Sequence, residues 1–320
     1  MAHLVTLGEL LVDFIAHEAG VPAGEATSWS ALPGGAPANV AVGAARLGVP
    51  TSFLGKVGDD PFGRMLERAL AAEGVETSGL RFEKGARTAL AFVSLGDDGE
   101  RSFHFYRHPS ADMLYRPDEV DLEAVRQARV LHFGSISLIA EPSRSATLAA
   151  VEAAREAGVT VTFDPNLRLD LWPGADEALS GIFAAMGQAH VVKLSEEELE
   201  FVAGGVGETY ARELARELDL LVITRAAKGA LLIAGDTTQE VPAFETNVVD
   251  TTGAGDSFMA ALVAGIVANP GIAEQPEALR EVALRANACA AITVSSRGAI
   301  PALPHAERLV EFLAREHVTK

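Results

Sequence analysis

Short apolar runs alternate with segments of helical periodicity through most of this sequence. Clear apolar runs occupy residues 130–136, 159–164, 189–194 and 220–224, and the helical segments between such runs span about 10 to 16 residues. In a compact protein this alternation favours a parallel, doubly wound sheet with helices on both faces. We therefore predict an α/β fold in which ligands bind beyond the carboxyl ends of the strands.

Two segments depart from this alternation and show the period-two pattern of antiparallel strands. Residues 88–95 and 101–107 flank a turn rich in glycine and aspartate at 96–99, which predicts a hairpin. We predict that insertions at about 13–33 and 88–108 form a small separate sheet on an otherwise single domain of 320 residues. Residues 5–13 are predicted to be one strand, which places Asp13 at a carboxyl strand end.

The composition argues against several classes of function. Lys and Arg number 26 and Asp and Glu number 44, so the net charge is −18, and neither nucleic acid nor an anionic membrane is an expected partner. Cys289 is the only cysteine, which excludes a disulfide framework. The eight histidines show no helical pairing with an acid, which argues against a metal hydrolase. Because neither a signal peptide nor an apolar run of about 18 residues is visible, we expect a cytoplasmic protein.

The stretch DTTGAGDSF, residues 250–258, lies between a predicted strand at 240–244 and an apolar helix that begins near Phe258. Its glycines permit a tight turn, and we expect the amide groups of residues 253–255 to lie unpaired at the positive end of the helix dipole. Such a helix start binds anions. A carboxylate at Asp256 would compete with an anion for these amides. Its position is explained if Asp256 instead faces a hydroxyl group and accepts its proton as that group attacks a bound phosphoryl group. The alternative is that Asp256 only caps the helix.

A second glycine-rich stretch, GGAPANVA at residues 34–41, runs into another predicted helix. In this order, the two motifs resemble the N-terminal and C-terminal signatures of the ribokinase-like (PfkB-type) carbohydrate kinases. The resemblance covers nearly the whole chain and implies a general base at Asp256, which deprotonates a sugar hydroxyl. The implied anion hole for the transferring phosphate consists of Gly253, Ala254 and Gly255. The sugar ligands implied in the N-terminal part are Asp13, Gly34, Gly35 and Asn39.

Within this family, three further stretches look specifically like those of fructokinases. They are FYRHPSADML at 105–114, GSISL at 134–138 and FDPNLRLDLWP at 163–173. The implied reaction transfers the γ-phosphate of ATP to the 6-hydroxyl of D-fructose. Additional sugar contacts are expected from Arg107, Asn166 and Arg168.

Two alternatives stay open at this point. A kinase for 2-keto-3-deoxygluconate or another sugar also fits, because Arg107 and Arg168 can pair with a carboxylate. By pattern alone, Arg107 fits a solvated arginine at a strand end nearly as well. The alternative from another class is a non-catalytic sugar or nucleotide sensor on the same fold. Such a sensor should have lost the base or the anion hole, and this chain retains the residues of both.

The resemblance also implies sites for ATP and its ions. Nucleotide contacts are expected from Lys193, Thr224, Lys228, Gly229 and Asn287. Glu198 is expected to organise Mg²⁺ through water, and Asp250 and Thr252 to bind a monovalent cation such as K⁺. The family usually has asparagine where this chain has Ser195, and Ser195 with Glu198 also fits a helix capping box. Lys228 fits a solvated turn lysine equally well.

In this family the small sheet forms a lid over the sugar site. A sheet of so few strands, with one face exposed, needs to be covered. We therefore expect a homodimer that associates through the lid.

Overall fold

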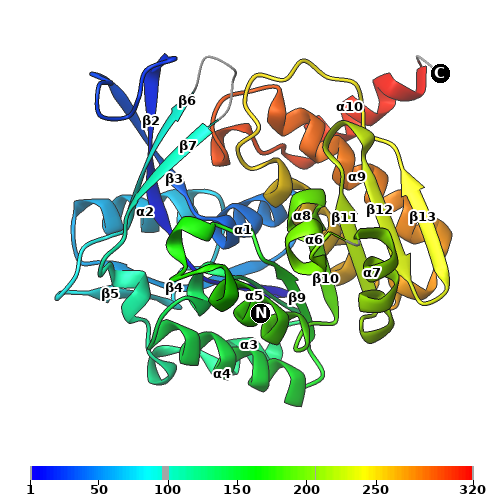
Figure 1. The fold of residues 1–320 in the computed structure, drawn as a ribbon, viewed down its shortest axis with the longest axis horizontal. Helices are drawn as coiled ribbons and strands as arrows, with labels where there is room; N and C mark the ends of the chain where they lie inside the picture. Colours follow the sequence, from blue (N-terminus) through cyan, green and yellow to red (C-terminus); the bar gives the residue numbers. More distant parts are fainter. Residues whose placement is uncertain (1, 96–100, 206, 319–320) are drawn as a thin grey trace.

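The computed structural model describes residues 2–95, 101–205 and 207–318. Its largest element is a nine-stranded sheet (Figure 1). In sheet order its strands are β13 (Thr237–Val241), β12 (Ala230–Ala234), β11 (Leu220–Thr224), β10 (Val191–Ser195), β9 (Thr160–Asp164), β8 (Val130–Gly134), β1 (Leu4–Leu7), β4 (Thr51–Gly58) and β5 (Leu80–Glu83). Neighbouring strands from β5 to β11 are parallel, whereas β12 and β13 are added antiparallel. The predicted α/β fold with a mostly parallel sheet is confirmed.

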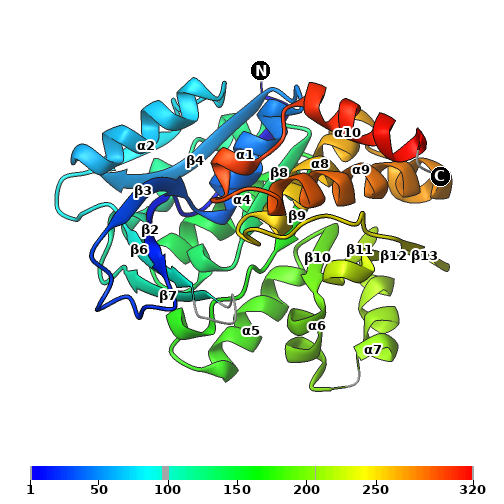
Figure 2. The same ribbon diagram turned by 90° about the horizontal axis from the view of Figure 1, so that it is seen from above.

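Helices cover both faces of this sheet (Figure 2). The helices of one layer are α1 (Ala36–Arg46), α2 (Pro61–Ala72), α8 (Ala254–Ala268), α9 (Pro276–Val294) and α10 (Ala306–Val318). The helices of the other layer are α3 (Leu122–Gln127), α4 (Ser143–Glu156), α5 (Ala175–Met186), α6 (Glu196–Ala203) and α7 (Gly207–Leu214). Because alternate residues of a strand point to opposite faces, Val192 of β10 packs in the core beneath α4 and α5, whereas Val191 packs in the core beneath α8 and α9. None of the helices in the described ranges is long and apolar enough to cross a membrane.

Close packing of α1 against α8 brings the two predicted motifs together. Gly43 of α1 faces Ala260 of α8, and a methyl group added to Gly43 would stand 2.7 Å from the Ala260 side chain. Small residues at this crossing let the two helix backbones approach. The N-termini of both helices therefore lie at the same edge of the sheet, above the carboxyl ends of the parallel strands.

A second sheet of four strands stands above this edge (Figure 1). In sheet order its strands are β3 (Trp29–Gly34), β2 (Leu11–Ala19), β6 (Leu90–Leu95) and β7 (Arg101–Tyr106). These strands occupy the two segments that depart from the helix–strand alternation, which confirms the small separate sheet. The predicted hairpin turn at 96–99 lies outside the described residues.

The prediction of a single strand at residues 5–13 is wrong. The chain breaks at residues 8–10, so that β1 lies in the large sheet and β2 in the small one. At Gly8 the chain passes close to the N-terminus of α1, because an added methyl group would meet the Pro37 ring at 2.5 Å. Asp13 consequently lies on a strand of the small sheet and not at a carboxyl strand end. The strand predicted at 240–244 is also displaced, since β13 ends at Val241.

Candidate active site

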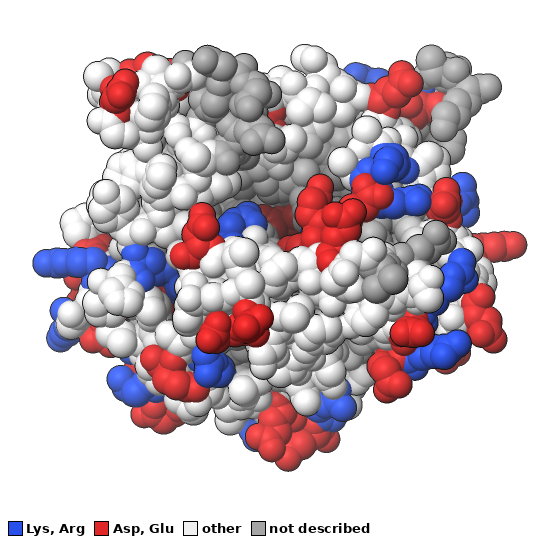
Figure 3. All heavy atoms as spheres, viewed as in Figure 1, with Lys and Arg blue, Asp and Glu red and all other residues white. Residues whose placement is uncertain are grey.

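A cavity of about 590 Å³ opens between the large sheet, the small sheet and the N-termini of α1 and α8. In the space-filling view, the molecule is hollowed between the small sheet and the body, and acidic and basic side chains lie on the floor of this hollow (Figure 3). The cavity is lined by Glu9, Leu11, Asp13, Gly35, Ala36, Asn39, Phe103, Phe105, Ile136, Asn166, Arg168, Lys193, Ser195, Glu198, Thr251, Thr252, Gly253, Gly255 and Asp256. Most of the predicted sugar-binding and phosphate-binding residues are therefore brought together at the predicted edge of the sheet.

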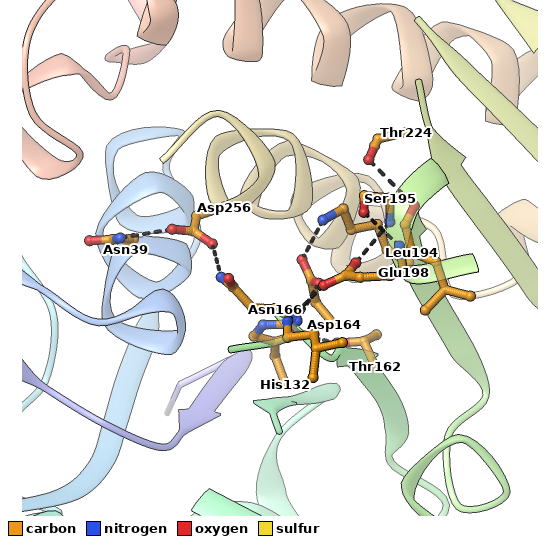
Figure 4. A network of polar contacts seen from close by, with 12 residues as sticks. Asn39, His132, Thr162, Asp164, Asn166, Leu194, Ser195, Glu198, Thr224 and Asp256 are labelled. Carbon is orange, nitrogen blue, oxygen red and sulfur yellow. Dashed lines mark hydrogen bonds and ion pairs between the residues drawn. The ribbon is translucent and has the colours of Figure 1, made fainter. Parts of the chain in front are cut away.

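Asp256 lies in the first turn of α8 and is only 6% exposed. Its two carboxylate oxygens accept hydrogen bonds from Asn39 Nδ2 at 2.8 Å and from Asn166 Nδ2 at 3.1 Å (Figure 4). Burial raises the pKa of Asp256 to about 6, and the neighbouring Asp164 raises it too, while the Asn39 hydrogen bond and the charges of Lys193 and Arg168 lower it. The carboxylate is thus a stronger base than an exposed aspartate.

The backbone before α8 has the geometry of an anion site. Gly253 has a φ of 77° and ends the turn, so α8 begins at Ala254. Among the described residues, the amide groups of Gly253 and Gly255 have no hydrogen-bond acceptor. The amide of Ala254 was expected to be unpaired as well, but it donates a turn bond of 3.3 Å to Thr251 O. Two of the three predicted donors therefore remain available to an anion at the positive end of the helix.

A buried ion pair lies beneath this turn. Lys193 Nζ is 2.9 Å from Asp164 Oδ2, and both side chains are almost completely buried. Burial alone would lower the pKa of Lys193, but the nearby carboxylates of Asp164, Glu198 and Asp256 outweigh it, so the pKa lies above its ordinary value. His132, whose Nδ1 contacts Thr162 Oγ1 at 3.0 Å, stays neutral because burial and the charge of Lys193 lower its pKa to about 3. This neutral ring is buried in the core and is not among the described residues that line the cavity.

Glu198 has both a structural and a potential metal-binding role. Its Oε2 accepts from Ser195 N at 2.8 Å and completes the predicted capping box of α6, while Oε1 accepts from Leu167 N at 2.8 Å. Each oxygen can accept a further hydrogen bond, and the residue lines the cavity. No group of three or more His, Cys, Asp or Glu side chains suited to a metal ion occurs in the described part of the chain. One carboxylate without a cage suits Mg²⁺ that keeps most of its water and binds phosphate oxygens.

The small sheet supplies the opposite wall of the cavity. Phe103 and Phe105 of β7 face inward, and the Arg168 guanidinium stands 5.3 Å from the centre of the Phe103 ring. Asp13 of β2 also faces inward, and a side chain on Gly34 would overlap its carboxylate. Gly34 therefore leaves room for the carboxylate that lines the cavity, although Gly34 itself is not among the described lining residues.

Several predicted site residues do not line this cavity in the described structure. Arg107 is neither in the cavity nor solvated, because it is buried, with Nε at 2.6 Å from Asp112 Oδ2 and Nη2 donating to Ile136 O. Asp250 accepts backbone hydrogen bonds from Thr252 at 2.7 Å and Gly298 at 2.8 Å. It thereby shapes the loop before α8. Whether Arg107 contacts the sugar and Asp250 a cation stays a prediction.

The predicted nucleotide residues beyond β10 also lie outside this cavity. Lys228 is exposed and lies 3.2 Å from Glu196. Gly229 has a φ of 90° and packs against the end of β13, and Thr224 Oγ1 donates to Leu194 O at 3.4 Å. Asn287 is buried, and its amide donates to Val241 O and Pro242 O. These contacts position the backbone near β13, and the predicted contacts with ATP stay predictions.

Sequence reasoning missed several lining residues. Phe103 and Phe105 carry a signal in retrospect, because they alternate on a strand of the predicted lid. Glu9 carries none: it follows Gly8 in the break between β1 and β2, its Oε1 accepts from Ala36 N at 3.0 Å, and its Oε2 has no partner among the described residues. Burial raises the pKa of Glu9 to about 7, although Arg107 lowers it.

Comparison with known proteins matches residues 1–306 to the pfkB family of carbohydrate kinases. The chain is 49% identical over 313 residues to the probable fructokinase-2 of Arabidopsis thaliana, which covers 97% of this chain and 95% of that protein. Its structure is similar to that of a fructokinase with bound ATP from Xylella fastidiosa, with a TM-score of 0.91 and 32% identity, covering 99% and 100% of the two chains. It is also similar to a fructokinase from Vibrio cholerae O395 in the fructose, ADP and calcium ion bound form, with a TM-score of 0.89 and 36% identity, covering 98% and 99%.

Proposed function

Since this chain belongs to the pfkB family of carbohydrate kinases, we propose that it is a fructokinase that transfers the γ-phosphoryl group of ATP to the 6-hydroxyl of D-fructose. One observation carries the chemistry. Asp256 is buried at the start of α8, held by two asparagine amides, directly beside the unpaired amides of Gly253 and Gly255. A base and an anion hole in adjacent residues match the two needs of phosphoryl transfer to an alcohol.

The reaction follows from this arrangement. The 6-hydroxyl oxygen of fructose bonds to the γ-phosphorus, and its proton passes to the carboxylate of Asp256. The bond between the γ-phosphorus and the β,γ-bridging oxygen breaks, and ADP leaves with that oxygen. In a loose transition state the charge spreads over the equatorial phosphoryl oxygens, where the amides of Gly253 and Gly255 stabilise it.

The sugar is expected to lie between α1 and the small sheet. Asn39 and Asn166 each use one amide N–H on Asp256, which leaves the second amide N–H of each and the carbonyl oxygen of Asn166 for hydroxyls. Asp13 from β2 and Arg168 on the facing wall complete a ring of polar groups, with Phe103 and Phe105 as an apolar side. This mixed lining suits a neutral sugar, which offers both hydroxyl groups and apolar C–H faces.

ATP with Mg²⁺ is the proposed phosphoryl donor. When bound with the nucleotide, Mg²⁺ would offset the negative charge of the phosphate groups. Glu198 would hold it through water, in line with its lone carboxylate at the cavity wall. We also propose that a monovalent cation binds at the loop before α8. Asp250 shapes this loop, and Thr252 of the same loop lines the cavity.

A homodimer through the small sheet is also part of this proposal. On the face turned away from the cavity, Phe92 stacks on Phe14 at 5.0 Å and contacts Trp29 and Tyr106 edge-on. Tyr106 is 67% exposed, so this aromatic face is incompletely covered in the single chain. An aromatic surface of this kind is typical of an interface between proteins.

We also expect the protein to be located in the cytoplasm.

The proposal is tested by ADP release from Mg·ATP with fructose, glucose, ribose, 2-keto-3-deoxygluconate and adenosine. We expect strong turnover with fructose. Turnover with the sugar acid instead would assign Arg168 to a carboxylate and replace the proposed substrate. Sugar binding without turnover on any acceptor would support the sensor and overturn the proposed activity.

A further inference from the structure

Helix α1 has no hydrogen-bonding cap of its own. It begins at Ala36, and its N-cap residue is Gly35, which has no side chain to accept from the first turn. Pro37 in the same turn has no N–H group. The first amide of the helix, Ala36 N, instead donates to Oε1 of Glu9 at 3.0 Å. A carboxylate from another part of the chain therefore caps this helix, at the positive end of its dipole.

The backbone around Glu9 packs tightly against the same turn. A methyl group added to Gly35, whose φ is 109°, would overlap the carbonyl oxygen of Glu9, and one added to Gly8 would meet the Pro37 ring. Gly8 and Glu9 belong to the break at residues 8–10, which leads from β1 in the large sheet to β2 in the small one. The start of α1 is thus held by the connection between the two sheets.

Asn39 lies one turn into α1 and depends on this turn for its position. Its backbone N donates to Gly35 O at 2.9 Å, and its side-chain Nδ2 donates to Asp256 at 2.8 Å (Figure 4). Its side-chain Oδ1 has no donor among the described residues. Because Asp256 is the only described partner of this side chain, the backbone of the first turn decides whether Nδ2 reaches the carboxylate.

We propose that Glu9 is a positioning residue for phosphoryl transfer, which caps α1 from the break between the two sheets and thereby holds the Asn39 amide on the base, Asp256. This inference rests on the proposed function. Glu9 is only 2% exposed, so bulk water does not replace the cap when the carboxylate is removed. Without the cap the first turn of α1 loosens. Asp256 then loses its orientation and the hydrogen bond that lowers its pKa.

Glu9→Leu tests the proposal, because leucine fills a similar space and accepts no hydrogen bond. We expect kcat to fall about tenfold or more, since the base is misplaced. The inflection of kcat/KM near pH 6 should rise by about one pH unit, because the Asn39 hydrogen bond that lowers the pKa of Asp256 is lost. The same rise is expected in an NMR titration of the Asp256 carboxyl carbon, which requires no turnover.

The direction of this change separates the cap from the charge of Glu9. The charged groups around the two carboxylates are the same in every variant of residue 9, and they are Arg107 and Asp112 beside Glu9, and Asp164, Lys193 and Arg168 beside Asp256. Loss of a negative charge at residue 9 would by itself lower the pKa of Asp256. Glu9→Gln loses this charge and keeps an acceptor for Ala36 N. It should therefore recover more than about a third of the wild-type kcat and keep the inflection near pH 6.

A double-mutant cycle with Asn39→Ala shows whether Glu9 acts through Asn39. If it does, the Glu9→Leu/Asn39→Ala double variant should have the same kcat and the same inflection as Asn39→Ala alone. The matched control for a lost cap is Asp121→Ala, because Asp121 caps α3 by accepting from Ala124 N at 3.0 Å. This control should lower the thermal midpoint of unfolding and keep the inflection in place.

Three results would overturn the proposal. They are additive losses of kcat in the double variant, a Glu9→Gln enzyme as slow as Glu9→Leu, and an unchanged titration of Asp256 in Glu9→Leu. Glu9→Ala, which introduces no bulk, gives the same comparisons should Glu9→Leu not fold. If the wild-type chain phosphorylates no sugar, the proposed function fails, but the NMR titration still decides whether Glu9 controls the pKa of Asp256.

Discussion

Two buried lysines in this chain have similar surroundings and different consequences. Lys193 pairs with Asp164 at 2.9 Å, and Lys56 pairs with Glu83 at 2.7 Å and Glu119 at 2.8 Å. Lys56 Nζ also donates to Leu114 O at 3.1 Å, so its three donors all have acceptors. Lys193 has one acceptor in the described residues and lines the cavity.

The comparison shows that burial and ion pairing by themselves do not identify a functional group. Lys56 ties β4 to β5 and to the segment around Glu119, and its pairing is complete without a ligand. The Lys193 ammonium group has two N–H donors without acceptors among the described residues, so its hydrogen bonds are complete only when a ligand binds in the cavity. Variants of the cavity cluster should therefore change turnover more than stability, and variants around Lys56 should do the opposite.

Asp256→Asn should give the largest effect. Removal of a general base typically lowers the rate by about 10²- to 10⁴-fold, and we expect kcat to fall by at least this much. Fructose affinity, measured by calorimetry, should be retained. The thermal midpoint of unfolding should not fall, because the substitution removes a buried charge whose pKa is already raised by burial.

The matched control is Asp60→Asn, at a buried aspartate that does not line the cavity among the described residues. Asp60 accepts hydrogen bonds from Gly63 N and from Thr88 N and Oγ1, so its loss should lower stability and spare turnover. An Asp256→Asn enzyme with more than about a tenth of the wild-type rate would contradict the assigned base.

Lys56→Met should lower the free energy of unfolding by about 3 kcal/mol, because breaking a buried ion pair leaves carboxylates without their partner. Glu83 and Glu119 keep some exposure, which favours the lower end of the usual range. Turnover per folded molecule should stay within about twofold of the wild type. Urea unfolding and steady-state kinetics measure the two quantities.

Lys84→Met, at an exposed lysine, serves as the control and should change stability by less than about 0.5 kcal/mol. If Lys56→Met instead abolished turnover without lowering stability, the contrast between the two lysines would be wrong.

The pH dependence should give the smallest effect. Below its pKa of about 6, Asp256 is protonated and accepts no proton, so kcat/KM at pH 5 should be roughly tenfold lower than on its plateau. Because the folded pKa lies above the ordinary value of 3.8, the contribution of Asp256 to stability falls as the pH rises from about 4 through 6.

Glu9 is the competing titratable group, since its pKa is raised to about 7 and it lines the same cavity. Glu9→Gln should leave the inflection near pH 6 in place. If the inflection disappeared in Glu9→Gln, the group that titrates in the pH profile of kcat/KM would be Glu9 and not Asp256.

Local patterns predicted much of the fold and the centre of the site. Strands β8, β9, β10 and β11 overlap the apolar runs at 130–136, 159–164, 189–194 and 220–224, because the hydrophobic period of a segment is a local property. Arg107 shows the limit of this reasoning. An arginine after a strand has the same local pattern whether it is solvated or, as here, buried against Asp112. The break at residues 8–10 was missed for a similar reason, since the Pro37 ring that Gly8 approaches belongs to another element.

Local sequence is enough to place a glycine-rich turn and a carboxylate at the start of one helix, because glycine turns and helix starts depend on neighbouring residues. The behaviour of that carboxylate depends on tertiary contacts. Asn39 lies 217 residues from Asp256 in the chain and Asn166 lies 90 residues away, yet both donate to it. The burial that raises its pKa to about 6 comes from packed elements distant in sequence, and the strength of the base is therefore a property of the whole fold.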